Sequence, residues 1–323
     1  MANLLTKRNL LWVIGLIGFF FLVHFLIEVR IITPYYRSIL YWIGIYMILG
    51  VSLNIIIGIT GQLSLGHAGF MSIGAYSSAI ILRSIPDLGG WFISVGVGLL
   101  ITMVVSFVVA MPALRLKGDY LAIATLGVGE IIRIVILNMK ITDGARGISN
   151  ITNLMSWPLM FAFVTAIVVL ASNFKNSAVG RACIAIKEDE IASESLGINP
   201  VKYKVMAFMI GAMMASVAGA LYATTYYVVK PETFGITTSI NILIVVVFGG
   251  MGSLSGSLFA ASFVGITNML LQSYGEIRTM IYAAILVLVM IFRPQGLLDN
   301  QEVTPFTIKD FIQQKFKRKE KHT

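Results

Sequence analysis

The stretch GQLSLGHAGFMSIGAY, residues 61–76, decides how the rest of the chain is interpreted. It directly follows an apolar run, residues 38–59, that is long enough to cross a membrane, yet it is rich in glycine and serine and contains Gln62 and His67. Backbone in the hydrocarbon of a bilayer must satisfy its own hydrogen bonds, so such a break is tolerated only where protein or water surrounds it. The stretch therefore predicts an interrupted membrane helix inside a larger bundle.

The composition of the whole chain supports a membrane location. Its 323 residues are 57% hydrophobic and 12% charged, with a mean hydropathy of +0.87. A soluble domain carries about 25% charged residues, and here the apolar residues come in long blocks. Strand-length alternation of polar and apolar residues is absent, which disfavours a membrane barrel. The sequence predicts an all-α polytopic membrane protein.

Helix length sets the number of predicted spans, because one span needs about 20 mostly apolar residues. We predict about ten transmembrane helices, with a range of 8–10 because one run begins inside the quoted stretch and another, 239–250, is too short to cross alone. The candidate spans are 10–27, 38–59, 65–82, 91–111, 120–138, 155–172, 206–228, 239–250, 257–272 and 279–292.

The distribution of basic residues orients the spans. The predicted cytoplasmic segments hold 16 of the 24 lysines and arginines, and the opposite loops hold 7. Cytoplasmic loops are enriched in basic residues, so both termini are predicted to be cytoplasmic, and the net charge of +9 needs no nucleic-acid partner. We divide the chain into a transmembrane domain, 1–298, and a basic cytoplasmic tail, 299–323. The tail has the pattern of an amphipathic helix on membrane lipid, and a disordered basic terminus is the alternative.

A second break of the same kind lies in the other half of the chain. FGGMGSLSGS, residues 248–257, is also rich in glycine and serine and follows an apolar run. Paired breaks in two halves are typical of a translocation pathway at a repeat interface. Close packing of small residues between helices is the alternative. The candidate pathway residues are Asn54, Gln62, Ser64, Gly66, His67, Glu130, Arg133, Gly249, Gly250 and Ser253.

Three ionisable residues within predicted spans have two interpretations each. Glu130 and Arg133 lie three positions apart on one helix face, so they form either a mutual ion pair or a polar contact in the pathway. His67 is either a satisfied core residue or a substrate contact.

The longest hydrophilic loop, residues 173–205, is predicted to contain a helix from Lys187 to Leu196. Gly197 suits a left-handed C-terminal cap, and Pro200 prevents continuation. A short helix with a small apolar face suits docking into a groove on a cytoplasmic partner, and a solvated connector is the alternative. The candidate contact residues are Glu188, Glu190, Ile191, Ala192, Glu194, Leu196 and Gly197.

Four ordered motifs resemble those of one transporter family. GRACIAIKEDEIASESLGINPVKYK (180–204) is similar to the coupling loop of ABC-importer permeases, in particular those of branched-chain amino acid importers. The other three motifs are GITGQLSLGHAGFMSIGAY (58–76), VVVFGGMGSLSGSLFAA (245–261) and FRPQGLL (292–298). The general coupling pattern is Glu-Ala-Ala followed by Gly, and here the acid, Glu190, stands one position early and is followed by Ile-Ala.

The resemblance implies a division of labour. It implies a permease subunit of a bacterial cell-membrane importer with a second homologous permease subunit, two cytoplasmic ATP-binding subunits and an extracytoplasmic substrate-binding protein. Leucine, isoleucine and valine are the implied substrates, and related permeases carry urea, short amides or other amino acids. None of the 30 glycines precedes a lysine, so no Gly-Lys phosphate-binding loop is present and ATP hydrolysis is assigned to the partners.

Two other functional classes fit the sequence less well. A stand-alone secondary carrier would leave the 173–205 loop without a role. An intramembrane enzyme is disfavoured because the three histidines lie far apart and no metal-ligand pair such as H-E-x-x-H occurs. The single cysteine, Cys183, cannot form an intrachain disulfide. No catalytic residue, metal or cofactor is expected.

Overall fold

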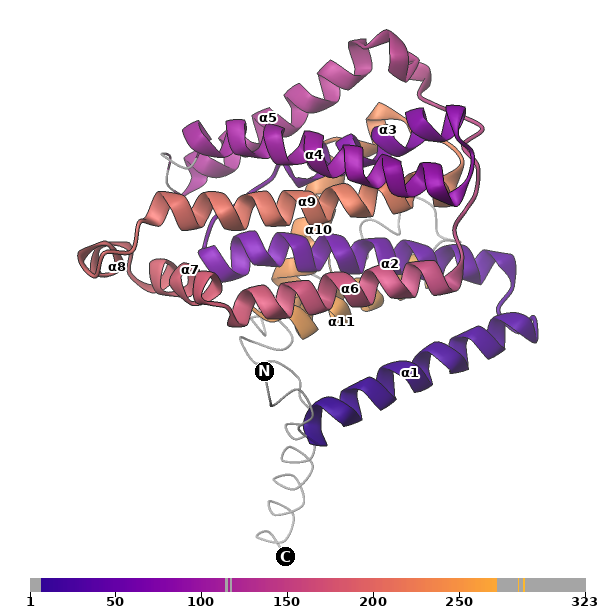
Figure 1. Ribbon diagram of the computed structural model, residues 1–323, viewed down its shortest axis with the longest axis horizontal. Helices are drawn as coiled ribbons and strands as arrows, with labels where there is room; N and C mark the ends of the chain where they lie inside the picture. Colours follow the sequence, from indigo (N-terminus) through magenta and orange to yellow (C-terminus); the bar gives the residue numbers. More distant parts are fainter. Residues whose placement is uncertain (1–6, 114–115, 117, 272–283, 285–286, 288–323) are drawn as a thin grey trace, which may run out of the picture.

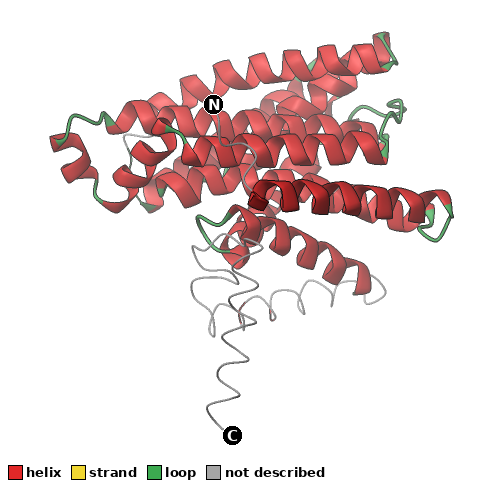
Figure 2. Ribbon diagram, turned by 60° about the horizontal axis from the view of Figure 1, so that its bottom comes forward, coloured by secondary structure: helices red, strands yellow, loops and turns green. Residues whose placement is uncertain are grey.

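The computed structural model describes residues 7–113, 116, 118–271, 284 and 287, and within them every regular element is a helix (Figure 2). The predicted tail, 299–323, and nearly all of the predicted span 279–292 lie outside the described residues. The helices are α1 Lys7–Glu28, α2 Pro34–Asn54, α3 His67–Ser84, α4 Leu88–Ala113, α5 Asp119–Asn138, α6 Trp157–Asn176, α7 Ala178–Glu188, α8 Glu190–Ser195, α9 Pro200–Tyr226, α10 Ile236–Gly249 and α11 Leu254–Leu270.

The predicted fold class is confirmed. Each predicted span up to residue 272 coincides with one of these helices, and α10 is short, as its sequence indicates. Among the described residues, five helices are long and apolar enough to cross a membrane: α2 with its extension to Ile59, α4, α5, α6 and α9. Shorter apolar helices cover Ile14–Glu28, Ile236–Gly249 and Leu254–Leu270. The chain is a polytopic helical membrane protein.

Burial separates the helices into a centre and a periphery. In the most apolar window of each helix, 78% of α2 and 72% of α9 is buried, against 28% of α4 and α5 and 22% of α6. An apolar helix that is mostly exposed in a membrane protein faces lipid. The helices α2, α3 and α9 therefore form the centre, and α4, α5 and α6 cover it (Figure 1).

Small residues bring α3 and α9 close together. A Cβ atom at Gly74 would overlap the carbonyl oxygen of Ser216, and one at Gly219 would overlap that of Met71. In lipid, helices associate by close van der Waals packing, and small residues at the contact permit it. From α4, the indole of Trp91 donates a hydrogen bond of 3.3 Å to the carbonyl of Ala220. Packing thus accounts for these central glycines.

The two ends of the bundle differ. At one end lie the short helices α7 and α8 and the beginning of α9 (Figure 1). At the other end the loops before α6 and before α10 meet, where Ile148 and Val229 exchange backbone hydrogen bonds of 3.0 and 2.9 Å. The end with α7 and α8 belongs to the segment 173–205 that the sequence predicts to be cytoplasmic.

Candidate functional site

The first interruption lies between α2 and α3, where the predicted spans 38–59 and 65–82 are separated. After Asn54, α2 widens into a π-helical turn, Ile55–Ile59, and α3 begins only at His67. The intervening residues 60–66, here called the first break, have no helical structure except at residue 60. Gly61 has a φ of +70°, a conformation that favours glycine. The backbone N–H of Gln62 reaches back to the carbonyl of Ile56 at 3.2 Å.

The second interruption separates α10 from α11. It comprises residues 250–253, here called the second break, in which Gly250 and Gly252 have φ values of +110° and +107°. The hydroxyl of Ser253 accepts a hydrogen bond of 3.0 Å from the backbone N–H of Gly256 and so caps α11. Gly249 ends α10 against α11, where a Cβ atom would meet the backbone of Gly256. Glycine is required here both by conformation and by space.

Asn54 joins the two halves of the chain. Its side chain is fully buried, and its amide nitrogen donates to the carbonyl of Ser253 at 2.8 Å, to the hydroxyl of Ser257 at 2.7 Å and to the carbonyl of Gly250 at 3.4 Å. Its amide oxygen accepts from the backbone N–H of Gly252 at 2.7 Å. One side chain at the end of α2 thus satisfies the irregular backbone of the second break. The sequence-predicted residues Asn54, Gly250 and Ser253 are brought together.

Three polar groups near the first break are buried without a hydrogen-bond partner. They are the amide oxygen of Gln62, the hydroxyl of Ser64 and Nδ1 of His67. Among the described residues, only Thr102 adds a further buried side-chain atom of this kind. Leaving such a group unpaired costs about 1–3 kcal/mol. A conformation, a water or a ligand that pairs these groups is therefore favoured.

His67 is anchored on its other side. It is fully buried, and its Nε2 lies 2.7 Å from the hydroxyl of Ser52, one side chain of α2. The next residue, Ala68, donates its N–H to the hydroxyl of Ser239 on α10 at 3.2 Å. The start of α3 is therefore linked by polar contacts to both α2 and α10.

Gly66 is fixed by contact with α5. A Cβ atom there would overlap the carbonyl oxygen of Thr125, and the N–H of Leu65 donates to the Thr125 hydroxyl at 3.0 Å. On the same helix, Glu130 and Arg133 form a mutual ion pair with an N–O distance of 2.7 Å. The structure therefore shows the mutual ion pair that the sequence allows. Within the described residues, no hydrogen bond joins this pair to Asn54 and the second break.

The helix predicted from Lys187 to Leu196 is wrong as a continuous element. Asp189 is extended, so Glu188 ends α7 and Glu190 begins α8. The carboxylate of Asp189 accepts a hydrogen bond of 2.9 Å from the N–H of Ala192, which caps the new helix. Aspartate is a favoured N-cap because it satisfies a backbone donor that has no partner within the helix.

The predicted left-handed cap at Gly197 is confirmed. Its φ is +83°, its N–H donates to the carbonyl of Glu194 at 2.9 Å, and the N–H of Ile198 donates to the carbonyl of Ser193 at 3.1 Å. This pair of bonds is the Schellman arrangement that ends many helices. The helix α8 is thus short and capped at both ends.

The helix α8 exposes its apolar side chains. Ile191 is 78% exposed and Leu196 is 83% exposed, while Ser193 is buried. An ion pair of 2.8 Å between Glu190 and Lys204 holds α8 against the start of α9. The remaining candidate contact residues, Glu188, Ala192, Glu194 and Gly197, are also exposed. The helix is anchored on one side and presents apolar surface on the other.

Two lysines connect the segment 173–205 with the two breaks, and the sequence analysis did not select them as site residues. Lys187 of α7 donates to the carbonyl of Gly58 at 2.9 Å, just before the first break. Lys175 at the end of α6 donates to the carbonyl of Gly252 at 2.7 Å, in the second break. Nothing in their sequence neighbourhood separates them from other basic loop residues.

Cys183 lies inside this segment and is not exposed. Its thiol is 3.6 Å from the carbonyl of Tyr203, and burial raises the pKa of the thiol to about 11. The neutral thiol packs α7 against α9. Among the described residues, no group of three His, Cys, Asp or Glu is placed to hold a metal ion.

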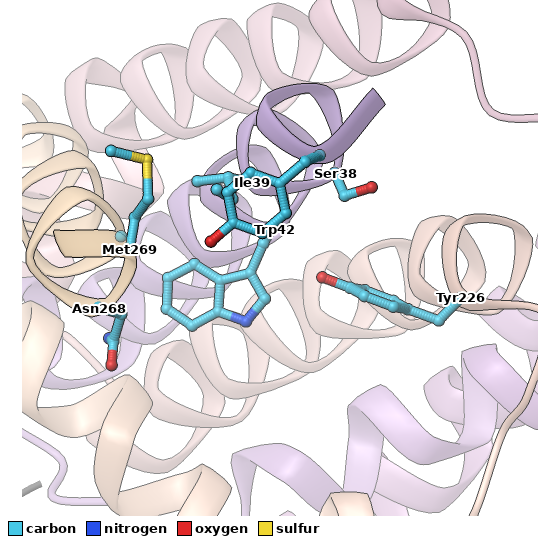
Figure 3. A pocket seen from close by; sticks show the side chains of 8 residues that line it. Ser38, Ile39, Trp42, Tyr226, Asn268 and Met269 are labelled. Carbon is cyan, nitrogen blue, oxygen red and sulfur yellow. The ribbon is translucent and has the colours of Figure 1, made fainter. Parts of the chain in front are cut away.

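A pocket of about 310 Å³ opens at the other end of the bundle (Figure 3). Its aromatic side chains are Tyr35 and Trp42 of α2 and Tyr226 of α9, and Asn268 of α11 adds an amide. The hydroxyl of Tyr226 points toward the indole of Trp42 (Figure 3). No sequence pattern predicts this pocket, because it is assembled from the ends of three helices that are far apart along the chain.

The two interrupted helices are buried and joined by Asn54, and lysines from the α7 end of the bundle bond to backbone carbonyls at the interruptions. This is the architecture of a membrane permease with interrupted spans. The chain belongs to the family described as "Branched-chain amino acid transport system / permease component", whose family model matches residues 35–293.

Curated relatives include permease proteins of high-affinity branched-chain amino acid transport systems. The chain is 37% identical to the high-affinity branched-chain amino acid transport system permease protein LivM of Salmonella typhimurium, covering 79% of this chain and 68% of that protein. It is 33% identical to the corresponding permease protein LivH of Escherichia coli, over 46% of this chain and 47% of that protein. A probable LivM of Methanocaldococcus jannaschii is 24% identical, over 82% and 93%.

Proposed function

We propose that this chain is the membrane permease subunit of an ATP-driven importer of leucine, isoleucine and valine. The observation that carries the proposal is the match of residues 35–293 to the permease family, together with 37% identity to a LivM protein. The relatives' substrates suggest the substrates of this chain. The chain itself performs no catalysis.

We infer that two cytoplasmic ATP-binding subunits drive transport by pressing on α8. Ile191 and Leu196 offer apolar area that a groove on a partner would bury, and burying one such side chain stabilises a contact by about 1.5–3 kcal/mol. The ion pair between Glu190 and Lys204 would pass a displacement of α8 on to α9. Lys187 and Lys175 would pass it on to the two breaks.

The proposed transport path runs along the two breaks. When the helices that flank them separate, the polar groups of Gln62, Ser64 and His67 gain partners in a passing zwitterion or its water. Glycine at positions 66, 249 and 250 keeps the backbone close and irregular, and Asn54 keeps the two breaks in register. In this account Glu130 and Arg133 remain candidates for a polar contact beside the path.

The pore of the importer contains a second, homologous permease subunit in this proposal. The relatives in Escherichia coli include both LivM and LivH as permease proteins of a high-affinity branched-chain amino acid system. This chain matches the LivM protein over 79% of its length and the LivH protein over 46%, which supports the LivM-like position in a pair of unlike subunits. A substrate-binding protein delivers the amino acid from the extracytoplasmic side.

The orientation follows from the charge distribution. We propose a bacterial cell-membrane location with both termini cytoplasmic, because the sequence segments predicted to be cytoplasmic, 173–205 among them, hold 16 basic residues and the opposite loops hold 7. The positive net charge then faces anionic lipid and involves no nucleic acid. The pocket at Trp42 would face the binding protein.

The test is gentle extraction of the tagged chain from its native membrane, followed by mass spectrometry of what copurifies and by an uptake assay. We expect two ATP-binding subunits, a second permease and ATP-dependent uptake of leucine, isoleucine and valine. Recovery of the chain alone, with transport that needs no ATP, would contradict the proposal and favour a secondary carrier. ATP-dependent uptake of urea or short amides in place of these amino acids would contradict the proposed substrate but not the proposed class of importer.

A further inference from the structure

A polar cavity of about 190 Å³ lies where the first break meets α7, α8 and α9. Its polar lining combines the first break with charged residues of the segment 173–205: Thr60, Gly61, Gln62, Lys187, Glu190 and Lys204. Leu116, Leu121 and Ile186 supply an apolar wall. The cavity is thus shared by the helix that breaks and by the helix that we assign to partner docking.

The charges around this cavity have both signs. The ammonium groups of Lys187 and Lys204 each carry three donors, and one donor of each serves the hydrogen bonds to Gly58 and Glu190 described above. The carboxylate of Glu190 accepts several hydrogen bonds at once. The amide oxygen of Gln62, a residue only 3% exposed, is a buried acceptor without a partner. Donors for an anion and acceptors for a cation therefore stand around one small space.

This arrangement fits a zwitterion better than a simple anion. An α-carboxylate would pair with Lys187 and Lys204, and an α-ammonium group would pair with Glu190. A small aliphatic side chain would lie on the apolar wall. A free anion would meet the repulsion of Glu190, and a free cation would meet that of the two lysines, at separations where Coulomb energies are large.

We propose that this cavity binds a free branched-chain amino acid from the cytoplasm and that its occupancy slows further import. The inference rests on the proposed function, which supplies the orientation and the substrate class. A ligand that contacts the first break, α8 and α9 together stabilises the arrangement in which they meet. Because a ligand shifts a conformational equilibrium toward the state that binds it better, it opposes the displacement of α8 on which transport depends.

The experiment uses the complete importer in liposomes, with the ATP-binding subunits facing the bath. The lumen holds the binding protein and labelled leucine, and ATP-driven release into the bath is measured. Unlabelled leucine is added to the bath. In parallel experiments it is replaced by 4-methylpentanoate, which lacks the amino group, or by 3-methylbutylamine, which lacks the carboxylate. The readout is the concentration that halves each variant's own uninhibited rate, so a general loss of activity does not mimic the effect.

We expect leucine to inhibit, and each analogue to need about a tenfold higher concentration, because each loses charge-assisted hydrogen bonds. Lys204→Met should raise the half-inhibiting concentration of leucine about tenfold. The matched control Lys202→Met, an exposed lysine in the same turn of α9, should leave it unchanged. Glu190→Gln should weaken inhibition by leucine. It should not weaken inhibition by 4-methylpentanoate, because this analogue has no ammonium group to pair with Glu190.

Three results would overturn the inference. If labelled leucine is released at an unchanged rate in saturating bath leucine, the cavity is not an inhibitory site. If bath leucine inhibits the Lys204→Met importer and the unaltered importer equally, the inhibition arises at another site. Both would leave the proposed function standing, since ATP-driven release of leucine would still be seen. Absence of any ATP-driven release of leucine would overturn the proposed function and this inference with it.

Discussion

At the scale of single residues, Asn54 connects parts of the chain that lie about 200 positions apart. Its hydrogen-bond partners are 196 to 203 residues away along the sequence. The sequence analysis selected Asn54, Gly250 and Ser253 because polar and small residues are unusual within apolar runs. Their meeting at one point was not predictable, because no local pattern encodes a contact over such a separation.

The first prediction concerns Asn54. Asn54→Leu keeps the approximate size of the side chain but removes its hydrogen bonds to the second break and leaves the partly buried N–H of Gly252 without this partner, at a cost of about 1–3 kcal/mol. We expect a lower thermal unfolding midpoint and at least a tenfold loss of uptake. The control is Asn138→Leu, an exposed residue of α5 whose side chain bonds only within its own helix. Equal stability and uptake in both variants would argue against Asn54 as the connection.

The second prediction uses two glycines on neighbouring elements. Gly66→Leu inserts a side chain into the carbonyl oxygen of Thr125 and should abolish uptake while the chain still reaches the membrane. Gly127→Leu, on α5, meets no atom within 4 Å of its Cβ and should retain uptake. Normal uptake with Gly66→Leu would show that the first break accommodates a large side chain, which would contradict a requirement for the close contact between Gly66 and α5.

The third prediction concerns the thiol of Cys183. Burial raises its pKa to about 11, so the thiol stays neutral at pH 9 and should react with a maleimide much more slowly than a free thiol. As the pH rises from about 9 to 11, the unfolded state loses the proton first, so the stability contributed by the neutral thiol is lost over that interval. Rapid labelling of the folded protein at pH 8 would contradict this burial.

At the scale of elements, the helices were predictable and their interruptions only partly so. Apolar runs located every predicted span that the structure describes, because length and hydropathy decide membrane crossing. The cap at Gly197 followed from the need for a left-handed residue. The division of the predicted helix at Asp189 was missed, because the charged stretch Lys187–Glu190 has good helix formers on both sides of the cap. Contacts of Asp189 with Ala192 decide it.

The fourth prediction tests α8 as the docking element. Ile191→Asp and Leu196→Asp place a charge on the two most exposed apolar side chains of this helix, and we expect the ATP-binding subunits to bind at least tenfold more weakly. Ile141→Asp, on the 3₁₀ turn Lys140–Thr142 at the other end of the bundle, is the control. Copurification in normal yield with both α8 variants would exclude α8 as the docking helix.

At the scale of the whole molecule, the predicted cytoplasmic segment and the two breaks are in contact with each other. The segment 173–205 lies at one end of the bundle (Figure 1), and Lys187 and Lys175 bring it into contact with both breaks. Composition and charge bias predicted a polytopic protein with a cytoplasmic loop. They did not predict this connection, because a lysine that bonds a carbonyl at a break looks the same in sequence as a lysine in solvent.

The measurement that tests the central claim most directly is the number of leucine molecules transported per ATP hydrolysed by the complete importer with Lys187→Met. Loss of the bond to Gly58 should uncouple the partner from the first break, so we predict that ATP hydrolysis continues while the ratio falls at least about tenfold. Arg181→Met, an exposed residue of α7 that bonds only Asn176, should leave the ratio unchanged. An unchanged ratio with Lys187→Met would contradict the account.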